Sequence, residues 1–465
     1  MTASRRTALF WVLFSLAFFL NQGLRINDMG LGNDTKEYLA EAYHIAHGQG
    51  FSTVHDPDTA EPLDAYRPPG YAAFLSLFIL ADPGLRHDRF EWYFDTPVDF
   101  EDIHAPAGIV AVKWVQAGLL FLAALLAMSL TRKLTDSKAC GYAALVLVSL
   151  HPFPTSYAHR LYAEGLAIPL IALFAWLLHR CLANRQWRDF ILAGLVLGAL
   201  ILTKGEWYYI GPFCLAWIGF TAALRPGQRA RLMAGALVIA LCAALFVVPW
   251  KMRNLHRFGR AMLSERSGVV LDLRSRYAVM SPRQSLAAFV YWSGVAGRDE
   301  LLESLFEPGD YQALEREKGI YRAVLDHSAE LEATHPRIEA DRIQFREAAG
   351  RILSHPWSYV RTLPVMAWRG MIDGHISVAN LVFYLLFAVG AWSLARRKDW
   401  ENLGALMPFV GQFLFNSLVT HNLPRLNGSG TVLLMVGSAV GACAWIAARR
   451  RRKAQMDQRG ANNSL

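Results

Sequence analysis

Long apolar runs recur along most of this chain, and short basic loops separate them. A helix that crosses a bilayer needs about 20 mostly apolar residues, because the hydrocarbon core is about 30 Å thick. By this measure the sequence predicts an all-α polytopic membrane protein with about ten transmembrane helices. The predicted spans are 8–27, 106–130, 139–157, 162–181, 189–203, 206–224, 232–250, 378–395, 402–420 and 430–448.

The composition agrees with a membrane protein. Hydrophobic residues make up 54% of the chain and charged residues only 18%, whereas soluble domains have about 45–50% and about 25%. The mean hydropathy is +0.22. The net charge of +9 does not indicate a nucleic-acid partner, because Arg and Lys lie in short clusters between apolar runs rather than on one face.

The loop charges predict the orientation of the chain. With the N-terminus in the cytoplasm, every alternate loop is basic, as the positive-inside rule requires. These loops carry Arg132, Lys133, Lys138, Arg180, Arg185, Arg188, Arg225, Arg229, Arg231, Arg396, Arg397 and Lys398, and the tail carries Arg449 to Lys453. Both termini are therefore expected in the cytoplasm. The first run has no small-residue cleavage site, so we expect a retained helix.

This topology divides the chain into six parts. Residues 1–27 hold the first span, 106–250 spans two to seven, and 378–448 spans eight to ten. Two long extracytoplasmic loops, 28–105 and 251–377, carry short amphipathic helices, which apolar spacing at 311–324 and 338–353 predicts for the second loop. Residues 449–465 form a basic cytoplasmic tail, which we expect to be disordered from Ala454.

The five cysteines do not indicate a metal or redox site. Cys140, Cys181, Cys214, Cys242 and Cys443 lie in or beside apolar runs, and no CxxC occurs. We therefore expect small core residues rather than a disulfide framework.

The first long loop begins with a candidate catalytic motif, Asn33-Asp34-Thr35-Lys36-Glu37-Tyr38. On a helix, Asp34 and Tyr38 lie on one face. Asp34 and Glu37 also fit a capping box at a helix start. The two interpretations are compatible, because a carboxylate fixed at a helix start can also act as a base.

A second motif, Tyr66-Arg67-Pro68-Pro69-Gly70-Tyr71, precedes an apolar stretch. Proline is favoured in a first helical turn and makes the preceding residue extended. Arg67 is therefore predicted just ahead of a short amphipathic helix on the membrane. The alternative is an ordinary interfacial helix with a snorkelling arginine.

Further charges lie near the same predicted membrane face. Glu164 follows Tyr162, Lys204 follows Gly194-x3-Gly198, Arg253 lies in Pro249-Trp250-Lys251-Met252-Arg253-Asn254, and the turn 421–427 contains His421 and Arg425. Ionisable groups at membrane depth are costly and are usually functional or paired. Each could be an interfacial anchor, but their arrival at one face indicates a site.

The order and spacing of these motifs resemble the GT-C superfamily of integral-membrane glycosyltransferases. The similar branch contains the protein O-mannosyltransferases and the lipid A aminoarabinose transferases. The resemblance rests on D-x-x-x-Y at Asp34, R-P-P-G-Y at Arg67, G-x3-G…T-K ending at Lys204, P-W-x-x-R-N at Pro249 and P-R at Pro424. Together these motifs cover nearly the whole membrane part.

The resemblance implies transfer of a sugar from a polyprenyl-phosphate donor to an acceptor on the outer face. It implies that Asp34 is the catalytic base and that Arg67, Lys204, Arg253 and Arg425 hold the donor phosphate. Tyr38, Tyr66, Glu164 and His421 are the expected substrate-binding residues. Thr35 and Leu426 depart from the family, many of whose members have an acid and a tyrosine at these positions. No cofactor or metal is indicated, although a divalent metal is compatible with the motifs.

These residue types suit a direct displacement. A carboxylate takes the proton of the acceptor hydroxyl, and fixed cations stabilise the charge that grows on the departing phosphate. A single displacement inverts the anomeric carbon. The resemblance also implies a bacterial inner membrane and leaves a glycolipid, polysaccharide or protein as acceptor.

Two other functions stay open. A transporter or flippase for lipid-linked sugars would explain the spans, but its charges should lie near the bilayer midplane in two related halves. A polysaccharide polymerase or ligase acts on similar donors at the same face. Only the pairing of D-x-x-x-Y with R-P-P-G argues against it.

Overall fold

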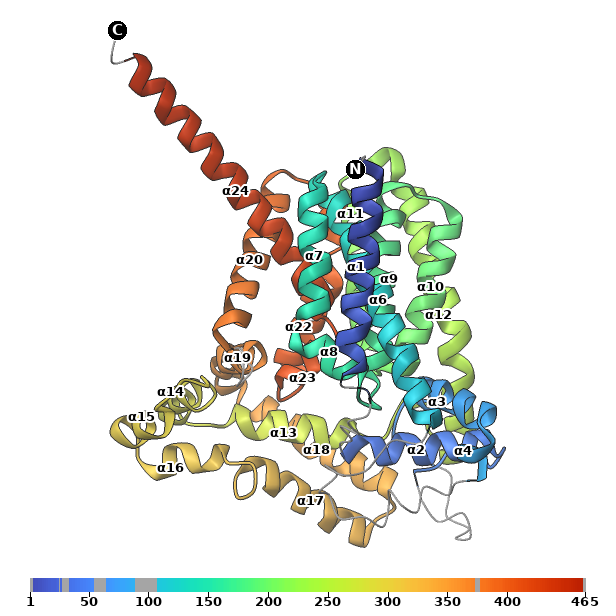
Figure 1. The fold of residues 1–465 in the computed structure, drawn as a ribbon. Coiled ribbons are helices and arrows are strands. Elements are labelled where there is room, and N and C mark those ends of the chain that lie inside the picture. Colours follow the sequence, from blue (N-terminus) through green and yellow to red (C-terminus); the bar gives the residue numbers. More distant parts are fainter. Residues whose placement is uncertain are drawn as a thin grey trace.

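The computed structural model describes residues 3–24, 26, 33–53, 64–87, 107–372 and 377–462, and no strand occurs among them. Most of the helices stand side by side in a bundle (Figure 1). The bundle contains α1 (Ala3–Gly23), α6 (Ala107–Thr135), α7 (Lys138–Leu150), α8 (Pro152–Ala158), α9 (Glu164–Ala183), α10 (Trp187–Thr203), α11 (Trp207–Ala223), α12 (Arg229–Phe258), α20 (Ser377–Arg396), α21 (Trp400–Gly404), α22 (Met407–Val419), α23 (Pro424–Gly428) and α24 (Thr431–Asn462), with the 3-10 turn η1 (Pro226–Gln228) ahead of α12.

A second group of helices lies across one end of the bundle, and we call it the end layer (Figure 1). It contains α2 (Asn33–Ala46), α3 (Gly70–Ala81), α4 (Pro83–His87), α13 (Ser267–Ala278), α14 (Pro282–Tyr291), α15 (Arg298–Leu305), α16 (Pro308–Tyr311), the 3-10 turn η2 (Gln312–Leu314), α17 (Ile320–Thr334) and α18 (Arg337–Ser354). The helix α19 (Pro356–Met371) leads from this layer back to the bundle.

Four helical stretches among the described residues are long and apolar enough to cross a membrane. They are Ala107–Thr135, Glu164–Ala183, Pro226–Phe258 and Thr431–Arg459. Shorter apolar helices, such as Leu9–Gly23, Asn380–Arg396 and Met407–Val419, stand beside them. The chain is thus an all-helical, multi-pass membrane protein, and the number of ten spans stays a prediction.

Helix boundaries differ from the predicted ones at three places. The predicted span 139–157 is two helices, because His151 has an extended backbone and Pro152 begins a new helix. The helix α12 continues past residue 250 to Phe258 and ends at Gly259, whose φ of 68° is left-handed. The disorder expected from Ala454 is wrong for the described residues, since α24 continues to Asn462.

Separate apolar cores hold the bundle and the end layer. The helices α2, α3 and α4 pack on α6 and on the segment before α9, through side chains that include Leu39, Tyr71, Leu75, Ile109 and Leu161. A second small core joins α13, α14, α17 and α19. The end layer is therefore anchored to the bundle rather than loosely attached to it.

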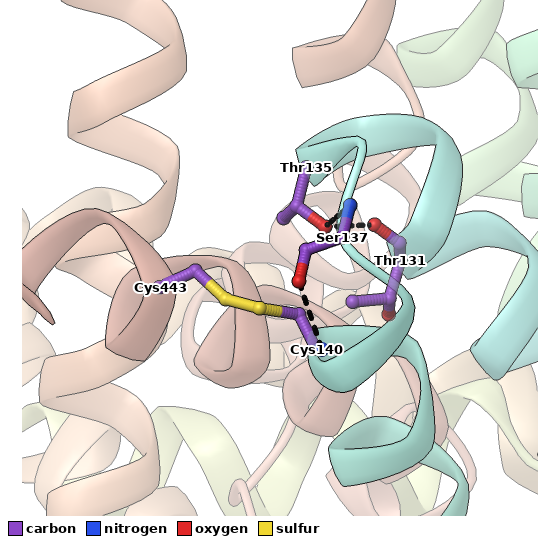
Figure 2. The surroundings of a disulfide bond; sticks show 5 residues. All are labelled: Thr131, Thr135, Ser137, Cys140 and Cys443. Carbon is purple, nitrogen blue, oxygen red and sulfur yellow. Dashed lines mark hydrogen bonds between the residues drawn. A yellow bond between two sulfur atoms is a disulfide. The ribbon is translucent and has the colours of Figure 1, made fainter. Parts of the chain in front are cut away.

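One disulfide corrects the expectation for the cysteines. Cys140 of α7 and Cys443 of α24 are bonded, with their Cα atoms 6.6 Å apart and a sequence separation of 303 residues (Figure 2). The Ser137 side chain caps α7 by accepting a hydrogen bond from the Cys140 amide, which fixes Cys140 in the first turn. Cys181, Cys214 and Cys242 are free, and the first two are buried as expected.

Candidate active site

Charged side chains from five segments meet where the bundle contacts the end layer. We call this set the ion-pair network; its members are Asp34 and Glu37 of α2, Arg67 ahead of α3, Glu164 at the start of α9, Lys204 and Glu206 between α10 and α11, and Arg425 of α23. Figure 1 shows α2 and α3 in the end layer and α23 at the end of the bundle that faces it.

Asp34 pairs with two arginines. Its Oδ1 lies 2.9 Å from Nη2 of Arg67, and its Oδ2 accepts a hydrogen bond from Nη2 of Arg425. Burial raises the pKa of Asp34, but Arg67 and then Arg425 lower it more, so that the pKa lies below the ordinary 3.8. Asp34 is the second residue of α2, in the first turn, where the helix dipole also favours a negative charge. The site therefore holds an ionised carboxylate.

Arg67 is buried at 7% exposure, which excludes the alternative of a snorkelling surface arginine. Its guanidinium contacts the carboxylates of Asp34 and Glu37 and donates a hydrogen bond of 3.3 Å to the hydroxyl of Tyr38. It also lies 4.6 Å from the centre of the Tyr38 ring. A guanidinium with five donors can hold several acceptors in a fixed geometry.

The glycine of the R-P-P-G motif explains how Arg67 reaches this place. A Cβ at Gly70 would lie 2.7 Å from the backbone carbon and oxygen of Leu202. Only glycine lets the start of α3 pack this closely on the end of α10. Because Lys204 follows α10 directly, the same contact brings the two cationic segments together.

Glu164 joins the two other cations. Its Oε1 lies 3.2 Å from Nε of Arg425 and 3.6 Å from Nζ of Lys204, and its side chain is only 3% exposed. Nζ of Lys204 also lies 3.5 Å from Oε1 of Glu206 and donates to Oγ of Ser429 at 3.3 Å. The sequence analysis missed Glu206, although the pattern Lys-x-Glu in a turn between two apolar runs signals a paired cation.

Buried amides fix the turn that carries Arg425. Nδ2 of Asn422 donates to the carbonyl of Met366 at 2.9 Å, and Nδ2 of Asn427 donates to the carbonyl of Gly370 at 3.1 Å. Nδ2 of Asn416 donates to Oδ1 of Asn427 at 2.9 Å. Sequence reasoning also missed these positioning residues, whose signal is three Asn residues at the end of an apolar run.

The two predicted tyrosines lie on either side of Arg67. Tyr38 is buried and packs edge to face on Tyr71, with ring centres 4.9 Å apart. The Tyr66 ring faces two arginines of the end layer, Arg337 at 4.0 Å and Arg266 at 4.7 Å. Tyr66 therefore links the ion-pair network to α13 and α18.

Two predicted site residues, Arg253 and His421, are not members of the ion-pair network. Nη1 of Arg253 donates to the carbonyl of Asp64 at 2.7 Å, and Nη2 to the carbonyl of Phe51 at 3.4 Å. Within the described contacts, Arg253 reaches no member of the ion-pair network but holds the segment that leads to Arg67.

His421 lies in the turn before α23, and Nδ1 of its ring is buried without a hydrogen-bond partner in the described structure. Burial, then Arg369 and Arg266, lower the pKa of His421 to about 3.

A buried acid that sequence analysis did not single out lies on the face of α2 that carries Glu37. Glu41 is completely buried, and neither carboxyl oxygen has a hydrogen-bond partner in the described structure. Burial raises the pKa of Glu41 well above 4.5, and nearby Arg67 offsets only part of this. Burial therefore favours the neutral form of Glu41, whereas the two arginines favour the ionised form of Asp34.

Among the residues that the structure describes, no group of three or more His, Cys, Asp or Glu side chains is placed to hold a metal ion. At the position where many relatives have a second acid, the hydroxyl of Thr35 donates to the carbonyl of Leu161 at 3.5 Å. The network places three cations, Arg67, Lys204 and Arg425, among four carboxylates, and the partly accessible Asp34 pairs with two of these cations. This arrangement suits proton removal beside a phosphate.

One family of known proteins matches part of the chain. Residues 105–250 match the family described as dolichyl-phosphate-mannose-protein mannosyltransferase. The expected enzyme class, a membrane-bound glycosyltransferase, is the class of this family. No curated protein matches the chain.

One solved structure agrees with the fold, and a second is more distantly similar. The archaeal oligosaccharyltransferase AglB from Archaeoglobus fulgidus, in complex with an inhibitory peptide and a dolichol-phosphate, is similar with a TM-score of 0.50 and 14% identity, over 97% of this chain and 52% of its own. This chain thus spans about half the length of that protein. ArnT from Cupriavidus metallidurans bound to undecaprenyl phosphate is similar with a TM-score of 0.38 and 15% identity, over 95% of this chain and 79% of its own. The family match confirms the predicted resemblance over residues 105–250, and the archaeal structure agrees with the predicted fold.

Proposed function

We propose that this chain is an inverting glycosyltransferase that moves a sugar from a polyprenyl-phosphate donor to an acceptor hydroxyl or phosphate at the outer face of a membrane. The observation that carries the proposal is the pairing of one carboxylate, Asp34, with both Arg67 and Arg425. The family matched by residues 105–250 and the dolichol-phosphate in the similar archaeal structure support this donor class.

The proposed reaction is one displacement at the anomeric carbon. The acceptor oxygen attacks this carbon while Asp34 takes the acceptor proton. The bond from the anomeric carbon to the phosphate oxygen breaks, and the electron pair leaves with the polyprenyl phosphate. Arg67, Lys204 and Arg425 are the proposed donors of hydrogen bonds to this phosphate, where they stabilise the growing negative charge.

Competition between the donor phosphate and Asp34 for two arginines would release Asp34 to act as the base. A donor phosphodiester would compete with Asp34 for the guanidinium groups of Arg67 and Arg425, because its two free oxygens accept hydrogen bonds from arginine as a carboxylate does. Its claim on both arginines would grow as the departing phosphate gains negative charge. Asp34 would then be free to accept the acceptor proton. Glu164, which is buried against Arg425 and Lys204, would keep both cations in place during this exchange.

The other predicted site residues have supporting roles in this proposal. Tyr38 and Tyr66 lie against Arg67, and His421 lies in the turn before α23; all three are proposed to contact substrate. Arg253 was predicted to hold the donor phosphate, but its hydrogen bonds to the carbonyls of Asp64 and Phe51 favour a positioning role. It would hold the 64–67 segment, and with it Arg67, against α12.

The membrane orientation is also a proposal. The start of α1 and the end of α24 lie on the side of the bundle away from the end layer (Figure 1), as expected when both termini are cytoplasmic and the site extracytoplasmic. The basic loops predicted on the cytoplasmic side support the same orientation. A bacterial inner membrane is the proposed location, with a glycolipid, polysaccharide or protein as acceptor.

Release of free polyprenyl phosphate tests the reaction class. The purified protein is offered a panel of polyprenyl-phosphate sugars together with crude envelope lipid, in parallel with the Asp34→Asn variant. Release from one donor that is lost in the variant supports the proposal and identifies the sugar. Movement of an intact lipid-linked sugar across vesicles, without release, would instead establish the flippase alternative.

A further inference from the structure

A pocket of 240 Å³ lies beside the turn that carries Arg425. Its walls include Tyr291 and Trp292 at the end of α14, Arg298 of α15, Arg369 of α19, and Leu423 and Pro424. The last two residues directly precede Arg425, whose side chain reaches Asp34. The pocket and the catalytic carboxylate thus adjoin the same turn.

Arg369 differs from the cations of the ion-pair network. Those cations each contact a carboxylate, whereas the Arg369 guanidinium lies against two aromatic rings, 4.2 Å from the centre of Trp292 and 5.1 Å from the centre of Tyr277. Its Nη1 is buried and has no hydrogen-bond partner in the described structure. Arg369 as a whole is half-buried, but a buried donor atom without a partner is costly unless an acceptor such as an anion binds to it.

A second arginine and the aromatic rings complete the lining. The Arg298 guanidinium lies 5.2 Å from the centre of the Tyr291 ring and pairs with the neighbouring Asp299 at 2.7 Å. Ligand sites commonly combine aromatic surface with a few polar groups that fix orientation. Flat rings suit the C–H faces of a sugar, and arginines suit a phosphate or carboxylate. The volume, below the roughly 300 Å³ of small drug sites, suits one sugar unit rather than a polyprenyl tail.

We propose that this pocket is an acceptor subsite that binds a sugar unit carrying an anionic group. The inference rests on the proposed function, which places the donor phosphate at the ion-pair network, where Arg425 of the same turn pairs with Asp34. The acceptor hydroxyl would then approach Asp34 while its anionic group is held by Arg369 and Arg298. This narrows the acceptor class to phosphorylated or acidic glycans.

Calorimetric titration of the purified full-length protein tests the pocket without a catalytic readout. The probes are glucose 1-phosphate, glucuronate, neutral glucose and inorganic phosphate. We expect the two anionic sugars to bind, with neutral glucose at least about tenfold weaker, because a hydrogen bond to a charged group is lost. Inorganic phosphate alone should bind more weakly than glucose 1-phosphate, since it does not use the rings.

Variants distinguish this pocket from the donor site. Arg369→Gln and Arg298→Gln should each weaken the binding of glucose 1-phosphate by about tenfold, so the inference stays testable if one of them does not fold. The matched control is Arg283→Gln, because Arg283 of α14 pairs with Asp310 and is not part of the pocket. The affinity of this variant for glucose 1-phosphate should equal that of the unchanged protein. Weakening by Lys204→Gln but not by the pocket variants would overturn the inference.

The pocket and the proposed function can fail separately. Binding of glucose 1-phosphate that depends on Arg369, together with no release of polyprenyl phosphate from any donor, would keep the pocket as an anionic-sugar site but overturn its acceptor role. Release of polyprenyl phosphate that depends on Asp34, together with binding of glucose 1-phosphate that does not depend on Arg369 or Arg298, would support the proposed reaction and overturn the inference about the pocket.

Discussion

Asp34 and Arg425 lie 391 residues apart in the sequence, and the Arg425 guanidinium donates a hydrogen bond to the Asp34 carboxylate. The contact joins the first helix of the end layer to the short helix before the last span of the bundle. Arg425 also contacts Glu164 at 3.2 Å. The candidate site therefore exists only when the first and last parts of the chain are folded together.

Replacement of Asp34 by Asn should reduce sugar transfer by about 10²–10⁴-fold, the usual contribution of a general base. The amide keeps the size of the side chain but cannot take a proton at neutral pH. Transfer is measured as release of polyprenyl phosphate at saturating donor, and folding is checked by thermal unfolding in detergent.

The matched control is Glu37→Gln. Glu37 lies on the same helix and also pairs with Arg67, but it does not contact Arg425 in the described structure. We expect less than a tenfold effect on transfer. Equal losses in the two variants would show that the positive charge of Arg67, rather than a base, is what both carboxylates support.

Replacement of Arg67 by Gln should move the acid limb of the pH profile to higher pH. The transfer rate needs the carboxylate form of Asp34, so the rate falls as pH drops through its pKa. Burial raises the pKa of Asp34, and Arg67 and Arg425 lower it. Without Arg67, the effect of burial is less opposed, so the pKa of Asp34 should rise. The profile is measured as rate against pH between about 4 and 8, near the ordinary range of carboxyl groups.

Arg67→Lys serves as the control for this shift. It keeps a positive charge near Asp34, so the acid limb should stay near its original position even if the rate falls. A limb that moves equally in both variants would contradict the electrostatic explanation.

Replacement of Arg253 by Gln should distinguish positioning from donor binding. Loss of the charged hydrogen bonds to the carbonyls of Asp64 and Phe51 should lower stability by about 1.5–3 kcal/mol. It should lower kcat without raising the KM for the donor. A raised donor KM at unchanged stability would restore the phosphate-binding role predicted from the sequence.

The sequence predicted the fold class because the bilayer imposes a length and an apolar character that each span must satisfy. It predicted less well where helices break or extend, as at His151-Pro152 and at Gly259, since apolar runs continue across these points. The Cys140–Cys443 bond was beyond prediction, because two cysteines 303 residues apart carry no spacing signal.

The site was predicted in part for a similar reason. Asp34, Arg67, Lys204 and Arg425 were identified because charges near membrane helices are rare and because their motifs recur in one family. The pairing of Lys204 and Arg425 with Glu164 could be seen only in the folded structure. Arg253 was grouped with them because it lies near the end of a predicted span and within the P-W-x-x-R-N motif, but its side chain donates to the carbonyl of Asp64 instead.

Replacement of Glu41 by Gln should change the dependence of stability on pH. The folded state raises the pKa of Glu41 well above 4.5, so the folded protein binds this proton more tightly than the unfolded chain. The resulting stability is fully present below pH 4.5 and is lost as pH rises through the folded pKa. We expect the stability of the Glu41→Gln variant not to fall in this way as pH rises. The melting temperature between pH 4 and 8 provides the measurement, and identical slopes for both proteins would show that Glu41 is ionised.

Replacement of Gly70 by Ala should destabilise the protein, because its Cβ would meet the Leu202 backbone at 2.7 Å. Overpacking against backbone typically costs about 1–3 kcal/mol. The added methyl should also push the Arg67 segment away from Lys204 and lower the transfer rate. Gly118→Ala, in the middle of α6 with nothing within 4 Å of its added Cβ, should be neutral or stabilising by up to about 1 kcal/mol. Thermal unfolding and polyprenyl phosphate release compare the two variants; equal stability would show that the α3–α10 contact does not set the position of Arg67.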